Sequence, residues 1–320
     1  MKTTYTIKPI LTGWQYLDKG QYATFREGIG TIIQHPVFAW LLEGGEHKYL
    51  VDTGMGSTEI SRKYHHDGRQ DPGTAIHEQV INMGLSTDDI EAIIFTHLHW
   101  DHCYYMKEFK KATYYVSDVE YVFALDPIPP YWGSYDHPKS GRTPQFDGCE
   151  FELITGEKEI FDGITMVPTP GHSPGHLCFF FPDQKVLFTA DLDLVKAGPY
   201  YGDKGSSIED TIRSLERIMT LDADIYLSAH GKQGIFDGDP EIVRQYLDVV
   251  YQRENRLLEA LNETPRTLDE VAALGIIYGK RDGSDIWFIA AAERKMMEKH
   301  LERLQTQGRI HQDGERYVVC

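Results

Sequence analysis

Short apolar runs recur along the chain and are separated by polar, turn-rich segments. Tyr5–Leu11 alternates polar and apolar residues, while Thr31–Ile33, Val37–Leu42 and Lys48–Val51 are rich in β-branched and aromatic residues. Runs of this kind, bounded by glycine turns, are typical of β-strands. The same pattern predicts later strands at 92–95, 112–116, 164–168, 185–190 and 224–229.

Helical patterns lie between these strands. Thr74–Met83 is amphipathic and ends at Gly84, and Ser117 precedes a short helical stretch through Leu125. Ser207 precedes a stretch whose apolar residues recur at helical spacing. Strands that alternate with helices predict an α/β fold.

Residues 241–320 have a different pattern. A long amphipathic helix is predicted over 241–262, Thr267 and Glu270 form a capping box, and a further helix runs from about Asp285 to Gln307. A hairpin follows, with Asp313-Gly314 in its turn. Helix, helix and hairpin outline a small winged-helix-like unit. We therefore expect a main domain over 1–240 and an extension over 241–320.

Basic and acidic residues alternate along the last of these helices. The basic residues are Arg294, Lys295, Lys299 and Arg303, and the acidic residues are Glu293, Glu298 and Glu302. Such a mixture indicates a solvated face or one that packs on a partner. It favours a structural role, including a homodimer contact, over nucleic-acid binding.

Composition agrees with this interpretation. The formal net charge of −17 repels phosphate backbones and argues against nonspecific nucleic-acid binding. Four cysteines without a Cys-x-x-Cys pair, and an N-terminus without an apolar signal core, predict a cytoplasmic protein with free thiols. No apolar run approaches the roughly 18 residues that a membrane helix needs.

Two segments carry polar or aromatic residues without periodicity. Asp126–Gly148 holds many prolines and aromatic residues, which favours an ordered flap over a site rather than a disordered loop.

His65 and His66 have no third ligand-type residue nearby, so we expect a solvated loop there.

The strongest chemical signal is Thr96-His97-Leu98-His99-Trp100-Asp101-His102, directly after the apolar run 92–95. Ionisable groups crowded in this way repel each other, or their pKa values shift far from normal, unless a cation binds them. The motif therefore predicts a metal site on the turn at the end of a strand.

Other predicted strands end in the same residue types. His172, Asp191 and His230 each follow an apolar run, and Asp52 follows Lys48–Val51. Asp52 has two interpretations: a carboxylate that caps the turn, or one that orients a metal-bound histidine.

This ligand set resembles that of the metallo-β-lactamase superfamily, whose His-x-His-x-Asp-His signature is matched without a gap, and the resemblance covers roughly residues 1–235. It implies a four-layer αββα sandwich in which His97, His99 and His172 hold one metal ion. Asp101, His102 and His230 would then hold a second ion, with Asp191 bridging the two. Asp52 matches the position of a supporting aspartate.

The resemblance also implies a mechanism. Two divalent ions would share a hydroxide that attacks a substrate carbonyl, so no serine or cysteine nucleophile is required. Cys103 is then a small buried residue, and Asp101 is the candidate acid for the leaving group. Imidazole and carboxylate ligands suit zinc and tolerate manganese, iron or cobalt.

Within the superfamily, the motif and Pro36–Leu41 look most like the N-acyl homoserine lactonases, which open cyclic esters. Those enzymes often carry a tyrosine where this chain has Leu194; Tyr200 and Tyr201 are candidates to replace it. We therefore expect a metal-dependent lactone or ester hydrolase acting on a small molecule. The winged-helix-like unit keeps a thioesterase similar to hydroxyacylglutathione hydrolase and an endoribonuclease open as alternatives. A non-catalytic metal-stabilised binding protein is an alternative from a different class.

Overall fold

The computed structural model describes residues 2–24, 27–127, 129–202, 206–231, 234–279 and 287–320. Its first β-sheet contains seven strands: β1 (Thr6–Asp18), β2 (Ile32–Gly44), β3 (His47–Val51), β4 (Gly68–Arg69), β5 (Ala92–Ile94), β6 (Thr113–Ser117) and β7 (Phe151–Ile154). They lie in the order β4-β1-β2-β3-β5-β6-β7. β3, β5, β6 and β7 are parallel neighbours, so their carboxyl ends meet at one edge.

The second sheet contains six strands: β8 (Lys158–Phe161), β9 (Ile164–Pro168), β10 (Leu177–Phe181), β11 (Val186–Ala190), β12 (Ile225–Ser228) and β13 (Ile235–Asp237). Their order is β13-β12-β11-β10-β9-β8. β11 and β12 run parallel, which brings the segments after Ala190 and Ser228 to the same edge.

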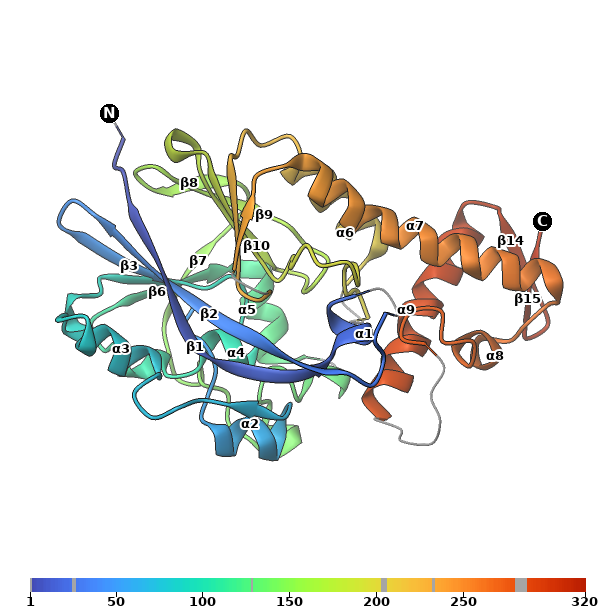
Figure 1. The fold of residues 1–320 in the computed structure, drawn as a ribbon, viewed down its shortest axis with the longest axis horizontal. Coiled ribbons are helices and arrows are strands. Elements are labelled where there is room, and N and C mark those ends of the chain that lie inside the picture. The colour runs from blue at the N-terminus through green and yellow to red at the C-terminus, as the bar shows by residue number, and fades with distance from the viewer. Residues whose placement is uncertain (1, 25–26, 128, 203–205, 232–233, 280–286) are drawn as a thin grey trace.

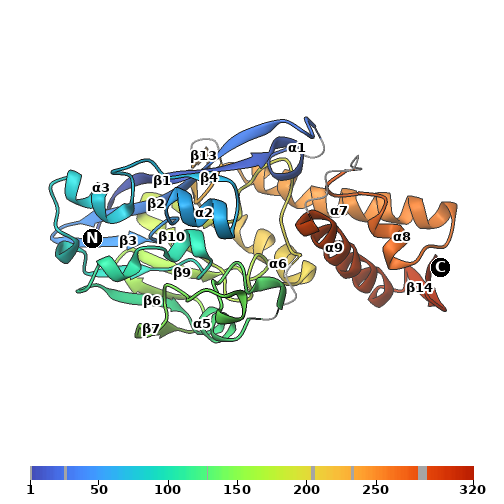
Figure 2. The ribbon, with the colours of Figure 1, turned by 90° about the horizontal axis from the view of Figure 1, so that it is seen from below.

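Alternating side chains place apolar residues on both faces of each sheet. Trp40 on β2 and Phe188 on β11 belong to one buried cluster between the sheets, with ring centroids 5.9 Å apart. The neighbouring Leu41 faces the opposite way and packs with Ile76 and Val80 of a helix. These clusters produce helix, sheet, sheet and helix layers (Figures 1 and 2), so the predicted αββα sandwich is confirmed.

The helices of the main domain are short, and three of the six below, α3, α5 and α6, were predicted. They are α1 (Lys19–Tyr22), α2 (Thr58–Tyr64), α3 (Ile76–Asn82), α4 (Trp100–Cys103), α5 (Asp118–Leu125) and α6 (Ile208–Ile218). Ser117 and Ser207 cap α5 and α6, because each hydroxyl accepts from the third residue after it. In the described part of the chain, no helix combines the length and apolarity needed to cross a bilayer.

The C-terminal region consists of α7 (Pro240–Glu263), α8 (Leu268–Ala272), α9 (Trp287–Thr306) and the hairpin β14 (Ile310–Asp313) and β15 (Arg316–Val319). The order of helices and hairpin follows the prediction, and the Thr267–Glu270 capping box is present. The predicted start of the last helix at Asp285 lies outside the described residues.

One apolar cluster connects the two predicted domains. Leu187 and Tyr226 of the second sheet belong to the same buried cluster as Leu257 of α7 and Leu301 of α9. Figure 1 shows α7 running from the second sheet to the hairpin. Apolar packing is continuous across residue 240. The division into two domains at that residue therefore stays a prediction.

The mixed-charge face of α9 is only partly solvated: Arg294 and Glu302 are exposed, but Glu293 is not. Glu293 is 3% exposed and accepts hydrogen bonds from the backbone N–H of Ile277 and of Tyr278, at 3.1 and 2.9 Å. His300 is fully buried. Part of this helix is therefore buried: Glu293 contacts backbone of the same region, and His300 contacts Tyr201 of the main domain.

Candidate metal centre

Asp52 fixes the base of the His-rich turn. Its carboxylate accepts from the N–H and the hydroxyl of Thr96, both at 2.8 Å, and lies 2.9 Å from Nδ1 of His102. Asp52 is fully buried and has a positive φ of 59°. A carboxylate that holds the outer nitrogen of a histidine orients the ring toward a metal. The geometry supports this interpretation of Asp52 over turn capping alone.

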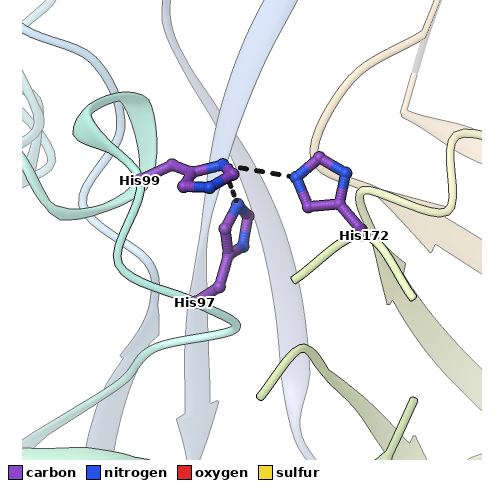
Figure 3. A group of neighbouring side chains, drawn as sticks. All are labelled: His97, His99 and His172. Carbon is purple, nitrogen blue, oxygen red and sulfur yellow. Dashed lines mark hydrogen bonds between the residues drawn. The ribbon is translucent and has the colours of Figure 1, made fainter. Parts of the chain in front are cut away.

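The first ligand group joins the His-rich turn to the loop after β9. Nε2 of His97 lies 3.0 Å from Nδ1 of His99, which lies 3.3 Å from Nε2 of His172. Figure 3 shows the three rings pointing to one place. Oδ2 of Asp191 lies 3.3 Å from His172 and 3.8 Å from His97. Four ligands around a tetrahedral zinc are spaced by about 3.3 Å, so these atoms fit one ion.

The second group uses the other oxygen of Asp191. Oδ1 lies 3.2 Å from Nε2 of His102 and 3.5 Å from Nε2 of His230. Asp101 is 3.9 Å from His102 and 3.7 Å from His230. Its Oδ2 also accepts a 2.6 Å hydrogen bond from Gln15. The structure thus brings together all seven residues that were expected to bind metal, in two groups joined at Asp191.

The protonation states of His97, His99 and Asp191 suit a cation. Burial lowers the pKa of His97 and of His99 well below the ordinary value, so these rings are neutral and able to bind metal. Burial opposes ionisation of Asp191, but His102 and His230 outweigh it and hold the carboxyl pKa well below its usual range. Burial likewise lowers the pKa of His102, yet Asp191 and Asp52 raise it well above normal.

Buried polar atoms that lack a hydrogen-bond partner give a further test of whether the site fits metal ions. No well-aligned hydrogen bond from the described residues reaches Oδ1 of Asp191 or Nε2 of His102, although both are buried and lie 3.2 Å apart. Buried polar atoms normally have partners, and exceptions mark ion sites. The donor set, its spacing and these atoms all fit divalent metal ions.

Glu120 on α5 is a supporting residue that the sequence did not reveal. It is fully buried, and Oε1 accepts from the backbone N–H of Leu98 at 3.0 Å. Oε2 accepts from the hydroxyl of Ser173 at 2.6 Å. Because Leu98 lies between His97 and His99 and Ser173 follows His172, Glu120 joins the loops that carry the first ligand group. Its spacing from Ser117 suggests only a local capping box.

His65 corrects the expectation of a solvated loop. Its side chain is 3% exposed and stacks on Trp100 with ring centroids 3.8 Å apart. Nε2 lies 3.2 Å from Asp136 of the flap. His66 lines the cavity beside the ligand groups. The pair was misinterpreted because its partners lie far away in the sequence.

The ligand groups open into a cavity of about 230 Å³. Tyr131 and Ser134 of the Asp126–Gly148 segment line it, and the ring of Tyr135 lies 4.8 Å from that of His99. The described part of this segment lies beside the site, as predicted. The C-terminal region also contributes lining residues: Tyr246, Arg253, Tyr278, Ala291, Ala292 and Lys295.

Comparison with known proteins agrees with this geometry. Residues 32–230, more than half of the chain, match the Metallo-beta-lactamase superfamily. The chain belongs to this superfamily.

The superfamily relatives include lactonases. N-acyl homoserine lactonase AiiA of Bacillus thuringiensis subsp. kurstaki is 27% identical over 218 residues, which cover 63% of this chain and 83% of the relative. N-acyl homoserine lactonase AttM of Agrobacterium fabrum is 27% identical over 177 residues, which cover 51% of this chain and 64% of the relative. The chain is a metal-dependent hydrolase of the superfamily, related to lactonases.

Solved structures show the same fold. A metallo-β-lactamase family protein from Thermus thermophilus has a TM-score of 0.66 at 23% identity and covers 89% of this chain and 94% of its own. An N-acyl homoserine lactone hydrolase, solved with N-hexanoyl-L-homoserine at its catalytic metal centre, has a TM-score of 0.58 at 23% identity. The latter match covers 72% of this chain and 94% of that protein.

Within this superfamily fold, the two candidate tyrosines have different surroundings. Tyr200 lines the cavity, and its ring centroid lies 6.3 Å from that of His172. Tyr201 is fully buried and its hydroxyl contacts Arg253 at 2.8 Å and His300 at 2.7 Å. Leu194 is 7% exposed and belongs to the apolar core. The structure therefore brings Tyr200 to the site. Tyr201, the other candidate, points away from it toward Arg253 and His300.

Proposed function

We propose that this protein is a dinuclear hydrolase that opens the carbonyl of an ester or lactone, with zinc as the preferred metal. The observation that carries the proposal is Asp191, whose two oxygens face separate groups of ligands. The curated relatives named N-acyl homoserine lactonase support a lactone or ester as substrate.

When bound, two divalent ions would acidify a shared water and polarise the substrate carbonyl. His97, His99 and His172 would hold one ion, and Asp101, His102 and His230 the other. Burial raises the pKa of Asp101, but His102 and His230 outweigh it and keep the pKa below normal.

The chain's own residues then complete the reaction. Ionised Asp101 accepts at Oδ1 the proton that the attacking water gives up, since Oδ2 is held by Gln15, and returns it to the leaving alkoxide. The hydroxyl of Tyr200 donates to the carbonyl oxygen as negative charge develops there. His99 and His172 also line the cavity, so a metal ion that they hold would face the substrate.

Metal analysis and a substrate panel test the proposal. We expect two zinc equivalents per chain, hydrolysis of lactones or simple esters, and loss of both metal and activity in Asp191→Ala. Asp222→Ala removes an exposed carboxylate and is the matched control. Turnover of thioesters or RNA with inert lactones and esters, or full activity in Asp191→Ala, would contradict the proposal.

A further inference from the structure

We infer that the cavity recognises a substrate with an anionic group, a carboxylate or phosphate oxyanion, at the wall that α7 and α9 contribute. The inference rests on the proposed function, because it specifies the substrate class of the same site. It follows from two basic side chains in the cavity of a strongly acidic protein.

Arg253 on α7 is the first of these side chains. It is 2% exposed, and its terminal nitrogens donate only to neutral oxygens: the carbonyls of Ala197 and Pro199 and the hydroxyl of Tyr201, at 2.7 to 2.8 Å. Its buried Nε has no hydrogen-bond partner among the described residues. A guanidinium stays charged in proteins.

A buried cation without an anionic partner is costly. Within the described residues no carboxylate forms an ion pair with Arg253, whereas Arg303 near it in the same region pairs with Glu254 at 3.1 Å. Because Arg253 lines the cavity, an anion bound there would compensate its charge.

Lys295 on α9 is the second basic side chain. It is half-buried and lines the same cavity, with Nζ 5.6 Å from the ring centroid of Tyr131. Its neighbour Arg294 points elsewhere and pairs with Asp269 at 2.8 Å. A lysine ammonium is a compact point charge with three donors, which suits a carboxylate or phosphate.

The other charges of the cavity have a separate origin. Its carboxylates, Asp101, Asp191 and Asp193, come from the ligand loops of the main domain and face histidines. The basic side chains come from the C-terminal helices. Aromatic rings complete the lining: Tyr22, Trp100, Tyr131, Tyr200, Tyr246 and Tyr278. This lining suits an ester with a largely apolar body and one negatively charged group.

Three matched esters test the inference: phenyl butanoate, the monophenyl ester of succinic acid, and phenyl 3-phosphonopropanoate. The terminal methyl group of the first is replaced by a carboxylate in the second and a phosphonate in the third. In the zinc-loaded protein, we expect at least one anionic ester to have a higher kcat/KM than phenyl butanoate. Lys295→Gln should lower the ratio of anionic to neutral kcat/KM by about tenfold. The anionic ester whose kcat/KM falls in Lys295→Gln identifies which oxyanion, carboxylate or phosphonate, the site recognises.

Arg294→Gln is the control, because it removes the same charge from the same helix outside the cavity. An unchanged ratio in Lys295→Gln, or an equal fall in Arg294→Gln, overturns the inference. Lys295 is preferred to Arg253 as the test position, since Arg253 also holds the loop at 197–201.

A binding measurement separates this inference from the proposed function. If neither esters nor lactones are hydrolysed, the proposed function fails, and calorimetry with the non-hydrolysable amides N-phenylsuccinamate and N-phenylbutanamide decides the inference. Weaker binding of N-phenylsuccinamate alone in Lys295→Gln supports the oxyanion site. Equal binding to the wild type and this variant overturns it.

Discussion

At the scale of single residues, Glu120 shows how a carboxylate remote from the metal ligands can control their geometry. In Glu120→Gln, a neutral amide replaces the acceptor that holds Leu98 N–H and the Ser173 hydroxyl. Changes of this kind around metal ligands lower metal affinity about 10- to 100-fold. We expect a rise of that size in the zinc dissociation constant, measured by competition with a chromophoric chelator.

Glu152→Gln is the control for Glu120, since it removes an exposed glutamate from β7. The cobalt-substituted protein adds a spectroscopic readout, because its d–d absorption reports ligand geometry. Unchanged zinc affinity together with an unchanged cobalt spectrum in Glu120→Gln would show that the ligand loops do not depend on this carboxylate.

The two adjacent tyrosines give opposite predictions. Tyr200→Phe removes a hydroxyl from the cavity and should lower kcat by about tenfold or more with zinc content unchanged. Tyr201→Phe instead removes a buried partner of Arg253 and His300 and should cost about 1–3 kcal/mol of unfolding free energy. Ester kinetics and chemical denaturation measure the two effects. The reverse pattern would show that the side chains have been assigned the wrong roles.

Several candidate metal ligands could be recognised at this scale because they lie just after an apolar strand. His97, Asp191 and His230 are therefore recognisable from the local pattern alone. Glu120 was not recognisable, since its partner Ser173 is 53 positions away. The contact of His65 with Trp100 is also a product of tertiary packing, which no local pattern encodes.

At the scale of elements, α9 packs a buried histidine against the main domain. Nε2 of His300 lies 2.7 Å from the hydroxyl of Tyr201, which can donate to it only while the ring is neutral. Burial lowers the pKa of His300 below its ordinary 6.5, despite the opposing effect of Glu254. In the folded protein the ring therefore stays neutral where an exposed histidine is already charged.

The sign of the pH dependence follows from this. Below about pH 6.5 the unfolded chain takes up a proton at His300 that the folded chain does not, so stability falls as the pH falls. One such group contributes up to about 1.4 kcal/mol per pH unit. We expect His300→Gln to reduce the drop in unfolding free energy between about pH 7.5 and pH 5.5.

His311→Gln, an exposed change on β14, should leave that drop unchanged. Denaturant unfolding at the two pH values measures it. A drop of the same size in His300→Gln and in the wild type would contradict the prediction.

Elements were predictable where local patterns decide them. Capping serines and apolar spacing located α5 and α6, and the Asp-Gly turn located the final hairpin. Helix α9 was located as well, but its surroundings were not. A buried Glu293 and a solvated glutamate look the same in sequence, because burial depends on distant backbone groups such as those of Ile277 and Tyr278.

At the scale of the whole molecule, the apolar cluster that spans the second sheet and the C-terminal helices predicts cooperative unfolding. Leu301 on α9 is fully buried in this cluster. Leu301→Ala should cost about 2–5 kcal/mol and lower the midpoint of a single transition. Differential scanning calorimetry measures this. A separate early transition for the C-terminal region would instead support an independent domain over 241–320.

The layered architecture followed from the sequence because a single ligand signature, at strand ends, is specific for its fold. How the extension meets the site did not follow. Tyr278, Arg253 and Lys295 reach the cavity only through the packing of α7 and α9 on the main domain. No periodicity or spacing in residues 241–320 indicates that contact.

The shared cavity has a consequence for directed evolution. The metal ligands come from the main domain, but Ala291 on α9 forms part of the wall. A larger residue at this position would reduce the volume of the cavity and leave every candidate metal ligand in place. A mutant library confined to α9 would therefore select among substrate sizes while retaining the reactive centre.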